Sequence, residues 1–241
     1  MKALITALAF LTRLPVPAVA PDAHTVGRSL LWYPLVGAGL GAIAALVGWG
    51  AGGLLGAALA VTALVLLSGA LHLDGLADTA DAWVGGLGDA ERTLAIMKDP
   101  SAGPVGVAAV VVVLLLELAA AETVLRQTVP TALVVAAMLG RAAAPALFLT
   151  TPYVRPGGLG DAMARHRPGA AVYAVLLATA AASVLLLGLT GLAALVAAAV
   201  TVAVARSLFL RRIGGITGDT VGATMVATQT LSLVAAALTL R

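Results

Sequence analysis

Long apolar stretches constrain this chain more than any other feature of its sequence. The stretch from Val107 to Leu116 is continuously apolar, and 61% of all residues are apolar while only 10% are charged. Soluble domains average about 25% charged residues, so this inventory could not cover a water-facing surface. A transmembrane β-barrel would need alternating apolar and polar positions, which this stretch lacks. The sequence therefore predicts an all-α, polytopic helix bundle that resides in a lipid bilayer.

The expected membrane spans can be placed by length. About seven stretches can cross a hydrocarbon core of about 30 Å, which needs about 20 helical residues. The shorter opening stretch, Met1 to Leu14, is interrupted by Arg13. We expect it to form an interfacial helix that stays attached, rather than a cleaved signal peptide. The expected spans lie near residues 29–49, 53–73, 105–125, 129–149, 169–188, 191–210 and 221–240.

The charged residues divide unevenly between the two sides of such a bundle. Segments 1–28, 74–104, 150–168 and 211–220 share one side and hold most of the Lys and Arg, whereas the other side has Arg126 and Arg241. The positive-inside rule makes the first side cytoplasmic. Most carboxylates lie there too, which that rule does not require, so we expect a functional site on this face. The basic excess is mild and scattered, which argues against nucleic-acid binding.

One motif on that side carries three carboxylates. Asp74, Asp78 and Asp81 lie on one face of a helix that turns about 100° per residue. Three neighbouring anions repel one another unless a cation lies among them. Carboxylate oxygens suit Mg²⁺, which proteins usually share with substrate phosphates. The motif therefore indicates a magnesium site, and the simpler alternative is a helix end whose acids face water.

Two further segments place glycines and basic residues just before an apolar helix. One runs from Arg92 through Lys98 and Asp99 to Gly106, and the other from Arg211 to Thr220. Free N–H groups at a helix start favour anions such as phosphate. Within the second segment, Asp219 is either a site residue or only an N-cap. Taken together, the three motifs predict metal-assisted group transfer from a diphosphate on one membrane face.

Two charges, Glu117 and Arg141, fall inside expected spans at similar depths. Pairing between adjacent antiparallel helices would lower the cost of burying each charge. We expect this pair to be structural.

Five stretches in order along the chain carry a resemblance to a known family: Phe10 to Pro17, Tyr33 to Gly37, His72 to Trp83, Ile96 to Asp99 with Gly103 and Gly106, and Gly214 to Gly222. In these motifs the sequence resembles the cobalamin synthase family, the adenosylcobinamide-GDP ribazoletransferases. The aspartate-bearing motifs are intact. The family pattern is not matched at four positions, where Lys, Arg and Glu are more usual: Glu117, Ser101, Val226 and Gln229.

The resemblance implies a Mg²⁺-dependent, multi-pass enzyme of the bacterial inner membrane, with its active face in the cytoplasm and residues 1–241 as one transferase domain. Its reaction would join adenosylcobinamide-GDP to α-ribazole, or to the 5′-phosphate of α-ribazole, and release GMP. The expected roles are metal binding by Asp74, Asp78 and Asp81; proton acceptance by His72, Asp99 or Asp219; and substrate binding by Arg13, Arg92, Lys98, Gly103, Gly214, Gly215 and Thr217.

Other membrane transferases and secondary transporters match these motifs less well. The CDP-alcohol phosphotransferases need a different spacing after Asp74-Gly75, and prenyltransferases need aspartate-rich motifs on two helices. A secondary transporter would bind its substrate near the bilayer midplane, where this chain has only Glu117 and Arg141.

Overall fold

The computed structural model describes residues 1–240, so Arg241 lies outside the described part of the chain. The prediction of an all-α fold is confirmed, with one isolated β-bridge between Tyr153 and Ile216. The elements are α1 (Lys2–Leu11), α2 (Ala23–Ser29), a 3₁₀ turn (Leu30–Trp32), α3 (Tyr33–Ala51), α4 (Gly53–Ser68), α5 (Leu71–Gly85), α6 (Ala90–Ile96), α7 (Pro104–Arg126), α8 (Thr131–Thr150), α9 (Gly158–His166), α10 (Gly169–Ile213) and α11 (Gly218–Thr239).

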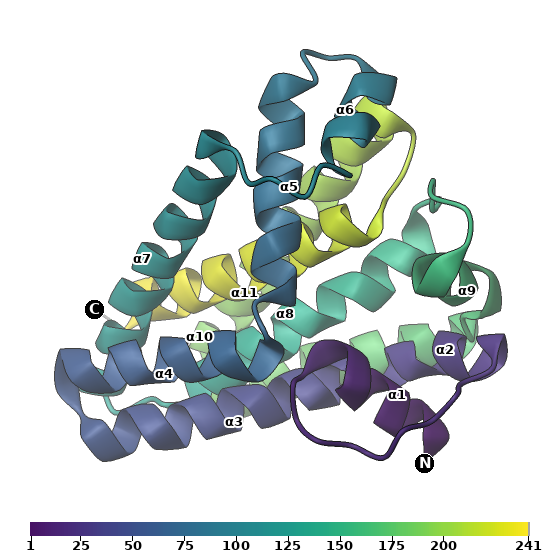
Figure 1. The fold of residues 1–241 in the computed structure, drawn as a ribbon. Helices are drawn as coiled ribbons and strands as arrows, with labels where there is room; N and C mark the ends of the chain where they lie inside the picture. Colours follow the sequence, from purple (N-terminus) through teal and green to yellow (C-terminus); the bar gives the residue numbers. More distant parts are fainter. Residues whose placement is uncertain (241) are drawn as a thin grey trace.

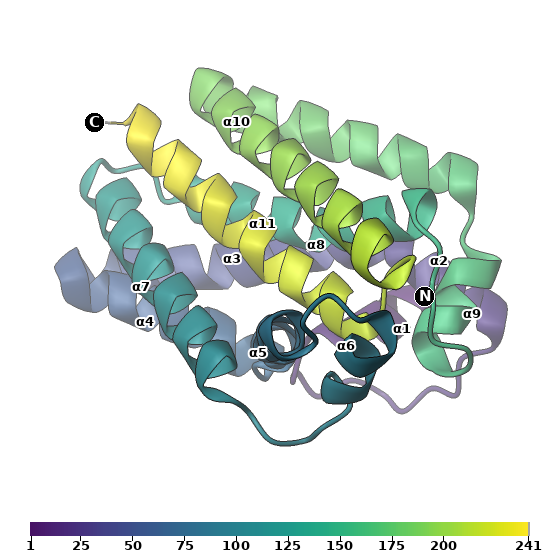
Figure 2. The same cartoon turned by 90° about the horizontal axis from the view of Figure 1, so that it is seen from above.

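Helix α8 lies at the centre of the bundle. Most of its residues are buried, and it packs against α3, α10 and α11. Helices α7 and α10 lie at the periphery and expose leucine and valine side chains, as expected for surfaces that face lipid. In Figures 1 and 2, α1, α2 and α9 gather beside the same end of the bundle, where they cover the ends of the long helices.

The count of seven spans is not confirmed. Five helices are long and apolar enough to cross a membrane, or six if the bent pair α4 and α5 forms one span. The two ranges expected near 169–188 and 191–210 lie within α10, whose 45 residues comprise two helices that meet at a kink. That element has non-helical backbone angles at Gly188, and Figure 2 shows it doubling back there.

A difference from the expected spans lies between α4 and α5. The span expected near 53–73 ends at Ser68, because Gly69 and Ala70 adopt left-handed backbone angles of φ 64° and φ 57°. The chain bends by 88° there, so α5 leaves the direction of α4 and lies across the bundle axis. Arg13, an expected substrate-binding residue, packs its side chain against Gly69 at this bend.

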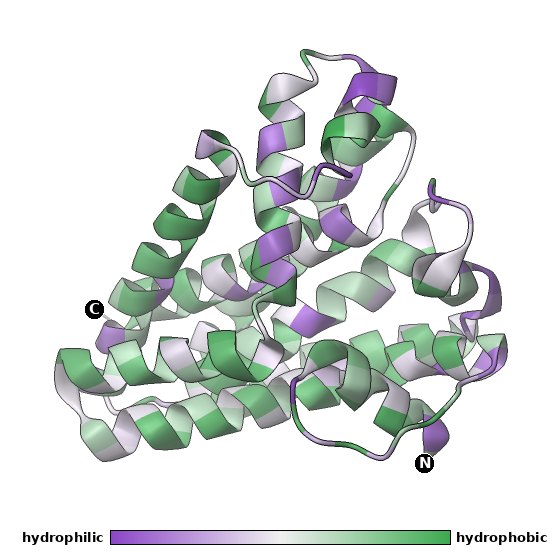
Figure 3. Ribbon diagram, in the orientation of Figure 1, coloured by the Kyte–Doolittle hydropathy of each residue, from purple (hydrophilic) through white to green (hydrophobic). Residues whose placement is uncertain are grey.

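Polar residues concentrate at one end of the molecule. Figure 3 shows the hydrophilic residues mainly on α5, α6 and the loops beside them, whereas α3, α4 and the outer face of α7 are hydrophobic. The joins between α3 and α4 and between α7 and α8, together with the bend in α10, lie at the opposite end. The chain therefore gathers its chemistry-bearing segments on one face, as its charge distribution predicts.

Candidate active site

The site is built where α5 crosses α11 at small residues. A Cβ at Gly75 would lie only 2.8 Å from the backbone oxygen of Asp219, and a Cβ at Gly222 would lie 3.5 Å from the Cα of His72. Glycine at position 75 allows this close approach, whereas a Cβ at Gly222 would make only ordinary contacts. The crossing brings Asp74 and Asp78 on α5 next to Asp219 at the start of α11.

Asp219 is held by an arginine that the sequence motifs did not single out. Arg155 donates to its Oδ2 at 2.6 Å. The N-cap of α11 is Thr217, which forms a capping box with Thr220, so the alternative that Asp219 is only an N-cap is wrong. Thr217 itself, an expected substrate-binding residue, is fully buried.

A short backbone pairing brings Arg155 to this position. The N–H of Ile216 donates to Pro152 at 2.8 Å, and the N–H of Val154 donates to Ile216 at 2.9 Å. Gly215 is needed here because a Cβ would collide with the backbone of Pro152. Gly214 ends α10 with φ 75°, a left-handed conformation that favours glycine. These two glycines therefore shape the loop that carries Asp219.

The carboxylates around the crossing repel one another. Partial burial and the neighbouring charges of Asp74 and Asp219 raise the pKa of Asp78 to about 6, while Arg155 acts in the opposite direction. A site with more carboxylates than cations favours a positively charged ligand. Asp74 is exposed and Asp78 is half-buried, so such a ligand could reach both.

Asp81 lies on the same face of α5 but has a structural partner. Its two oxygens accept the backbone N–H groups of Gly103 at 2.7 Å and Gly106 at 2.9 Å, at the start of α7. A Cβ at either glycine would collide with this carboxylate. Across residues 1–240, no three His, Asp or Glu side chains lie close enough to form a preassembled metal site.

The loop between α6 and α7 carries the other expected charges. Met97 is buried and its sulfur accepts the hydroxyl of Thr217 at 3.8 Å, which anchors the loop to α11. Lys98 and Asp99 are exposed, and Asp99 accepts the backbone N–H of Ser101 at 2.9 Å. Arg92 is also exposed, in the first turn of α6.

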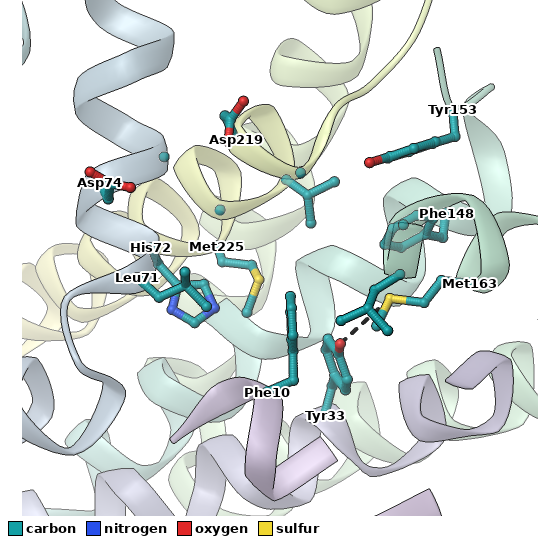
Figure 4. Close-up of a pocket in the computed structure, with 16 residues that line it drawn as sticks. Phe10, Tyr33, Leu71, His72, Asp74, Phe148, Tyr153, Met163, Asp219 and Met225 are labelled. Atoms are coloured by element: carbon teal, nitrogen blue, oxygen red, sulfur yellow. Dashed lines mark hydrogen bonds between the residues drawn. The ribbon is translucent and has the colours of Figure 1, made fainter. Parts of the chain in front are cut away.

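A cavity of about 220 Å³ opens beside the crossing. Asp74 and Asp219 lie together at one side of it in Figure 4, and Phe10 and Tyr33 lie at the other. His72 also lines the cavity and is only 6% exposed. Burial lowers the pKa of His72 to about 3, so its imidazole is uncharged. Of the three expected proton acceptors, His72 and Asp219 line this cavity, whereas Asp99 does not.

A second polar cluster lies deep in the bundle. Gln229 on α11 donates to Oε1 of Glu117 at 2.7 Å and accepts from Arg141, and Thr230 also donates to Glu117 at 3.0 Å. Glu117 and Arg141 are therefore linked through Gln229. Within residues 1–240 no ion pair joins Glu117 and Arg141 directly. The two expected partners are instead connected by Gln229, which the sequence did not identify as part of this pair.

Comparisons with known proteins agree over nearly the whole chain. Residues 3–237 match the family described as cobalamin-5-phosphate synthase. An adenosylcobinamide-GDP ribazoletransferase of Stutzerimonas stutzeri is 54% identical over 99% of this chain and 98% of its own length. The protein of the same name from Pseudomonas aeruginosa PAO1 is 52% identical over the same shares. No solved structure matches the chain.

Proposed function

The chain belongs to the cobalamin-5-phosphate synthase family, and from this premise we propose how its residues act as an adenosylcobinamide-GDP ribazoletransferase of cobalamin biosynthesis. The transfer joins adenosylcobinamide-GDP to α-ribazole, or to its 5′-phosphate. In chemical terms, a ribose hydroxyl forms a bond to the phosphorus attached to cobinamide, the bond to GMP breaks, and the hydroxyl proton leaves. Residues 1–241 form one transferase domain in this proposal. The family match favours this enzyme over the transporter and the other transferases compared above.

The donor set at the crossing fits a magnesium ion. Asp74 and Asp78 supply hard carboxylate oxygens, and partial burial together with the charges of Asp74 and Asp219 raises the pKa of Asp78. We propose that these two residues hold Mg²⁺. When bound, Mg²⁺ would neutralise the diphosphate and stabilise the negative charge on departing GMP. Both oxygens of Asp81 already bind the start of α7, so its role as a third ligand remains a prediction, and its observed contacts position α5.

Arg155 is placed to bind the diphosphate. Its Nε and one terminal nitrogen are buried and have no hydrogen-bond partner within residues 1–240, while the other terminal nitrogen binds Asp219. A guanidinium offers paired donors that match phosphate oxygens. Lys98 and Arg92, on the exposed segment next to α5, would add positive charge for the nucleotide part of the substrate. Arg13 would affect substrate binding indirectly, because its side chain packs against the α4–α5 bend at Gly69 and so helps to position α5.

Asp219 is our proposed acceptor for the hydroxyl proton. Its Oδ2 is bound by Arg155, its Oδ1 accepts no hydrogen bond within residues 1–240, and the residue lines the cavity. A general base must lie within hydrogen-bond reach of the proton it removes. His72 is farther inside the protein, and Asp99 lies on the exposed loop.

The bundle would cross the bacterial inner membrane several times, with the crossing of α5 and α11 at its cytoplasmic face. The observation that supports this orientation is the concentration of basic segments at that end of the bundle.

A turnover assay tests the proposal. Purified protein in lipid or detergent is incubated with adenosylcobinamide-GDP, α-ribazole and Mg²⁺, and cobalamin and GMP are quantified. We expect equal amounts of both products, and a chelator should stop the reaction until Mg²⁺ is restored. Absence of product beside an active relative would overturn the proposal.

Arg155→Lys provides a sharper version of this assay. Lysine keeps the positive charge but loses the paired donors, so the KM for adenosylcobinamide-GDP should rise about tenfold or more. Arg126→Lys is the matched control, because Arg126 is exposed at the far end of α7 and, within residues 1–240, forms an ion pair with Glu122 alone. Equal KM values for the two variants would remove Arg155 from the diphosphate site.

A further inference from the structure

We propose that the cavity beside the α5–α11 crossing binds the fused aromatic base of α-ribazole, and that His72 donates a hydrogen bond to the free ring nitrogen of that base. The inference rests on the proposed function, because it assigns one part of that reaction's substrates to this cavity.

The cavity wall is suited to a flat apolar ring. Phe10 stacks near Tyr33 with centroids 6.3 Å apart, and Phe148 stacks near Tyr153 with centroids 5.8 Å apart. These four residues come from α1, α3, α8 and the loop after α8, and Figure 4 shows them around one space. Aromatic side chains bind planar apolar groups through their faces and edges.

His72 is the unpaired polar side chain inside this wall. Both of its ring nitrogens are buried and have no hydrogen-bond partner within residues 1–240. The Tyr33 hydroxyl, by contrast, already donates to the sulfur of Met163 at 3.6 Å. An imidazole always carries at least one N–H donor. Because a buried polar group without a partner is costly, this donor indicates a ligand with an acceptor at that point.

The base of α-ribazole fits these properties better than the corrin ring or guanine does. The corrin ring is far too large for a cavity of about 220 Å³. Guanine carries several donors and acceptors that would lose their water without gaining partners among phenylalanine, leucine and methionine side chains. The benzimidazole-type base of α-ribazole is flat and apolar, and its glycosidic bond leaves a single ring nitrogen free to accept a hydrogen bond.

The position of the cavity also orients the nucleoside. Asp74 and Asp219 lie at one side of the cavity, next to the expected metal and diphosphate. A base held between the aromatic pairs would leave its ribose at these carboxylates. The attacking hydroxyl and its proton acceptor would then meet without movement of the helices.

The first experiment narrows the cavity. A Cβ at Gly222 makes only ordinary contacts, so Gly222→Leu can place its side chain against the cavity wall. We expect the KM for α-ribazole to rise about tenfold or more, and the KM for adenosylcobinamide-GDP to change less than about twofold. Gly39→Leu is the matched control, since Gly39 lies on an exposed face of α3 with no neighbour within 4 Å.

The second experiment tests the hydrogen bond by exchanging one atom of the ligand. An indole riboside replaces the free ring nitrogen with a C–H group. Wild-type protein should use the benzimidazole riboside with a kcat/KM at least about tenfold higher than the indole riboside. His72→Leu should bring the two values within about twofold of each other, because the donor is gone.

The outcomes separate this inference from the proposed function. If wild-type protein makes no GMP with either nucleoside, the proposed function fails. If wild-type protein is active and Gly222→Leu raises only the KM for adenosylcobinamide-GDP, or changes neither KM, the cavity does not bind the base. If His72→Leu keeps the tenfold preference, or lowers kcat equally for both nucleosides, His72 does not bind the ring nitrogen. The ligand comparison decides the matter even if Gly222→Leu fails to fold.

Discussion

Two charged regions lie beside helix α11 and differ in how their charges are compensated. The mouth cluster consists of Asp74, Asp78, Arg155 and Asp219, and the core cluster consists of Glu117, Arg141, Gln229 and Thr230. In the core cluster the single carboxylate and the single arginine balance each other through Gln229. In the mouth cluster three carboxylates face one arginine, and Asp74 and Asp78 accept no hydrogen bond within residues 1–240.

This difference separates two uses of charge in a membrane protein. Glu117 and Arg141 are 4% and 5% exposed, so their charges are compensated by protein groups alone. The mouth cluster keeps an excess of negative charge where solvent and substrate can reach it. Charge in the core cluster therefore stabilises the fold, whereas charge in the mouth cluster is available for a ligand. The two clusters should respond in opposite ways to the removal of one carboxylate.

The largest effect should follow Asp78→Asn in the mouth cluster. Loss of this carboxylate should lower kcat by about 10²–10³-fold, because a ligand of the proposed Mg²⁺ ion is lost. The free energy of unfolding should stay the same or rise slightly, because repulsion with Asp74 and Asp219 is relieved. Steady-state turnover and denaturant unfolding measure the two quantities.

Glu91→Gln is the control for that substitution, since Glu91 is exposed at the start of α6. It should change neither quantity. If Asp78→Asn keeps normal turnover, or if it destabilises the protein strongly, then the mouth cluster is structural and the comparison fails.

The opposite pattern is expected for Glu117→Gln in the core cluster. The substitution leaves the buried charge of Arg141 uncompensated, so the free energy of unfolding should fall by about 3–5 kcal/mol. Turnover per folded molecule should remain within about twofold of the wild-type value, because the core cluster does not line the cavity.

Glu122→Gln on the same helix is the matched control. Glu122 forms an exposed i,i+4 pair with Arg126 at 3.3 Å, and such pairs contribute about 1 kcal/mol or less. Similar destabilisation by both variants would show that the core cluster does not stabilise the bundle. A large loss of kcat in Glu117→Gln would instead give the core cluster a part in the reaction.

The sequence was sufficient to predict the class of fold and the face that carries the site. Apolar runs and charge asymmetry are properties of whole segments, so predictions based on them do not change when a helix boundary is misplaced by a few residues. The bend at Gly69 and Ala70 could not be predicted in this way, because it depends on two left-handed backbone angles inside an apolar run. For the same reason the predicted span near 53–73 is longer than the observed helix, which ends at Ser68.

Individual site residues were harder to predict where their partners lie far away in the chain. Spacing alone placed Asp81 with Asp74 and Asp78 on one face, but only packing shows that Gly103 and Gly106 occupy both of its oxygens. Arg155 was missed because its motif contains no feature other than a basic residue in a loop. The backbone pairing between Pro152 and Ile216 brings Arg155 to the site. A single β-bridge leaves no pattern in the sequence from which this position could be predicted.

The departures from the family pattern at Glu117 and Gln229 have a shared explanation. The two side chains contact each other directly at 2.7 Å, so an unusual residue on α7 is matched by an unusual residue on α11. Considered singly, each departure put substrate contacts in question. Their contact places both in the core cluster, away from the mouth cluster.

The smallest expected effect is that of Gly75→Ala on kcat. It tests whether a change at the mouth cluster leaves the core cluster unaffected. A methyl group at Gly75 would press on the backbone of Asp219, which cannot rotate away, so Gly75→Ala should lower kcat about tenfold through displacement of α5. Gly39→Ala, with no neighbour within 4 Å, should leave kcat unchanged. Asp219 and Gln229 lie ten residues apart, or about 15 Å along the helix.

At that separation, Gly75→Ala and Glu117→Gln should act additively. The double variant should lose the sum of the two single losses in unfolding free energy, within about 0.5 kcal/mol, and its kcat should match that of Gly75→Ala. A double-mutant cycle in one detergent measures both quantities. A larger coupling would mean that the displacement passes from the mouth cluster to the core cluster, through α11 or through His72 and Met225, which line the cavities beside both clusters.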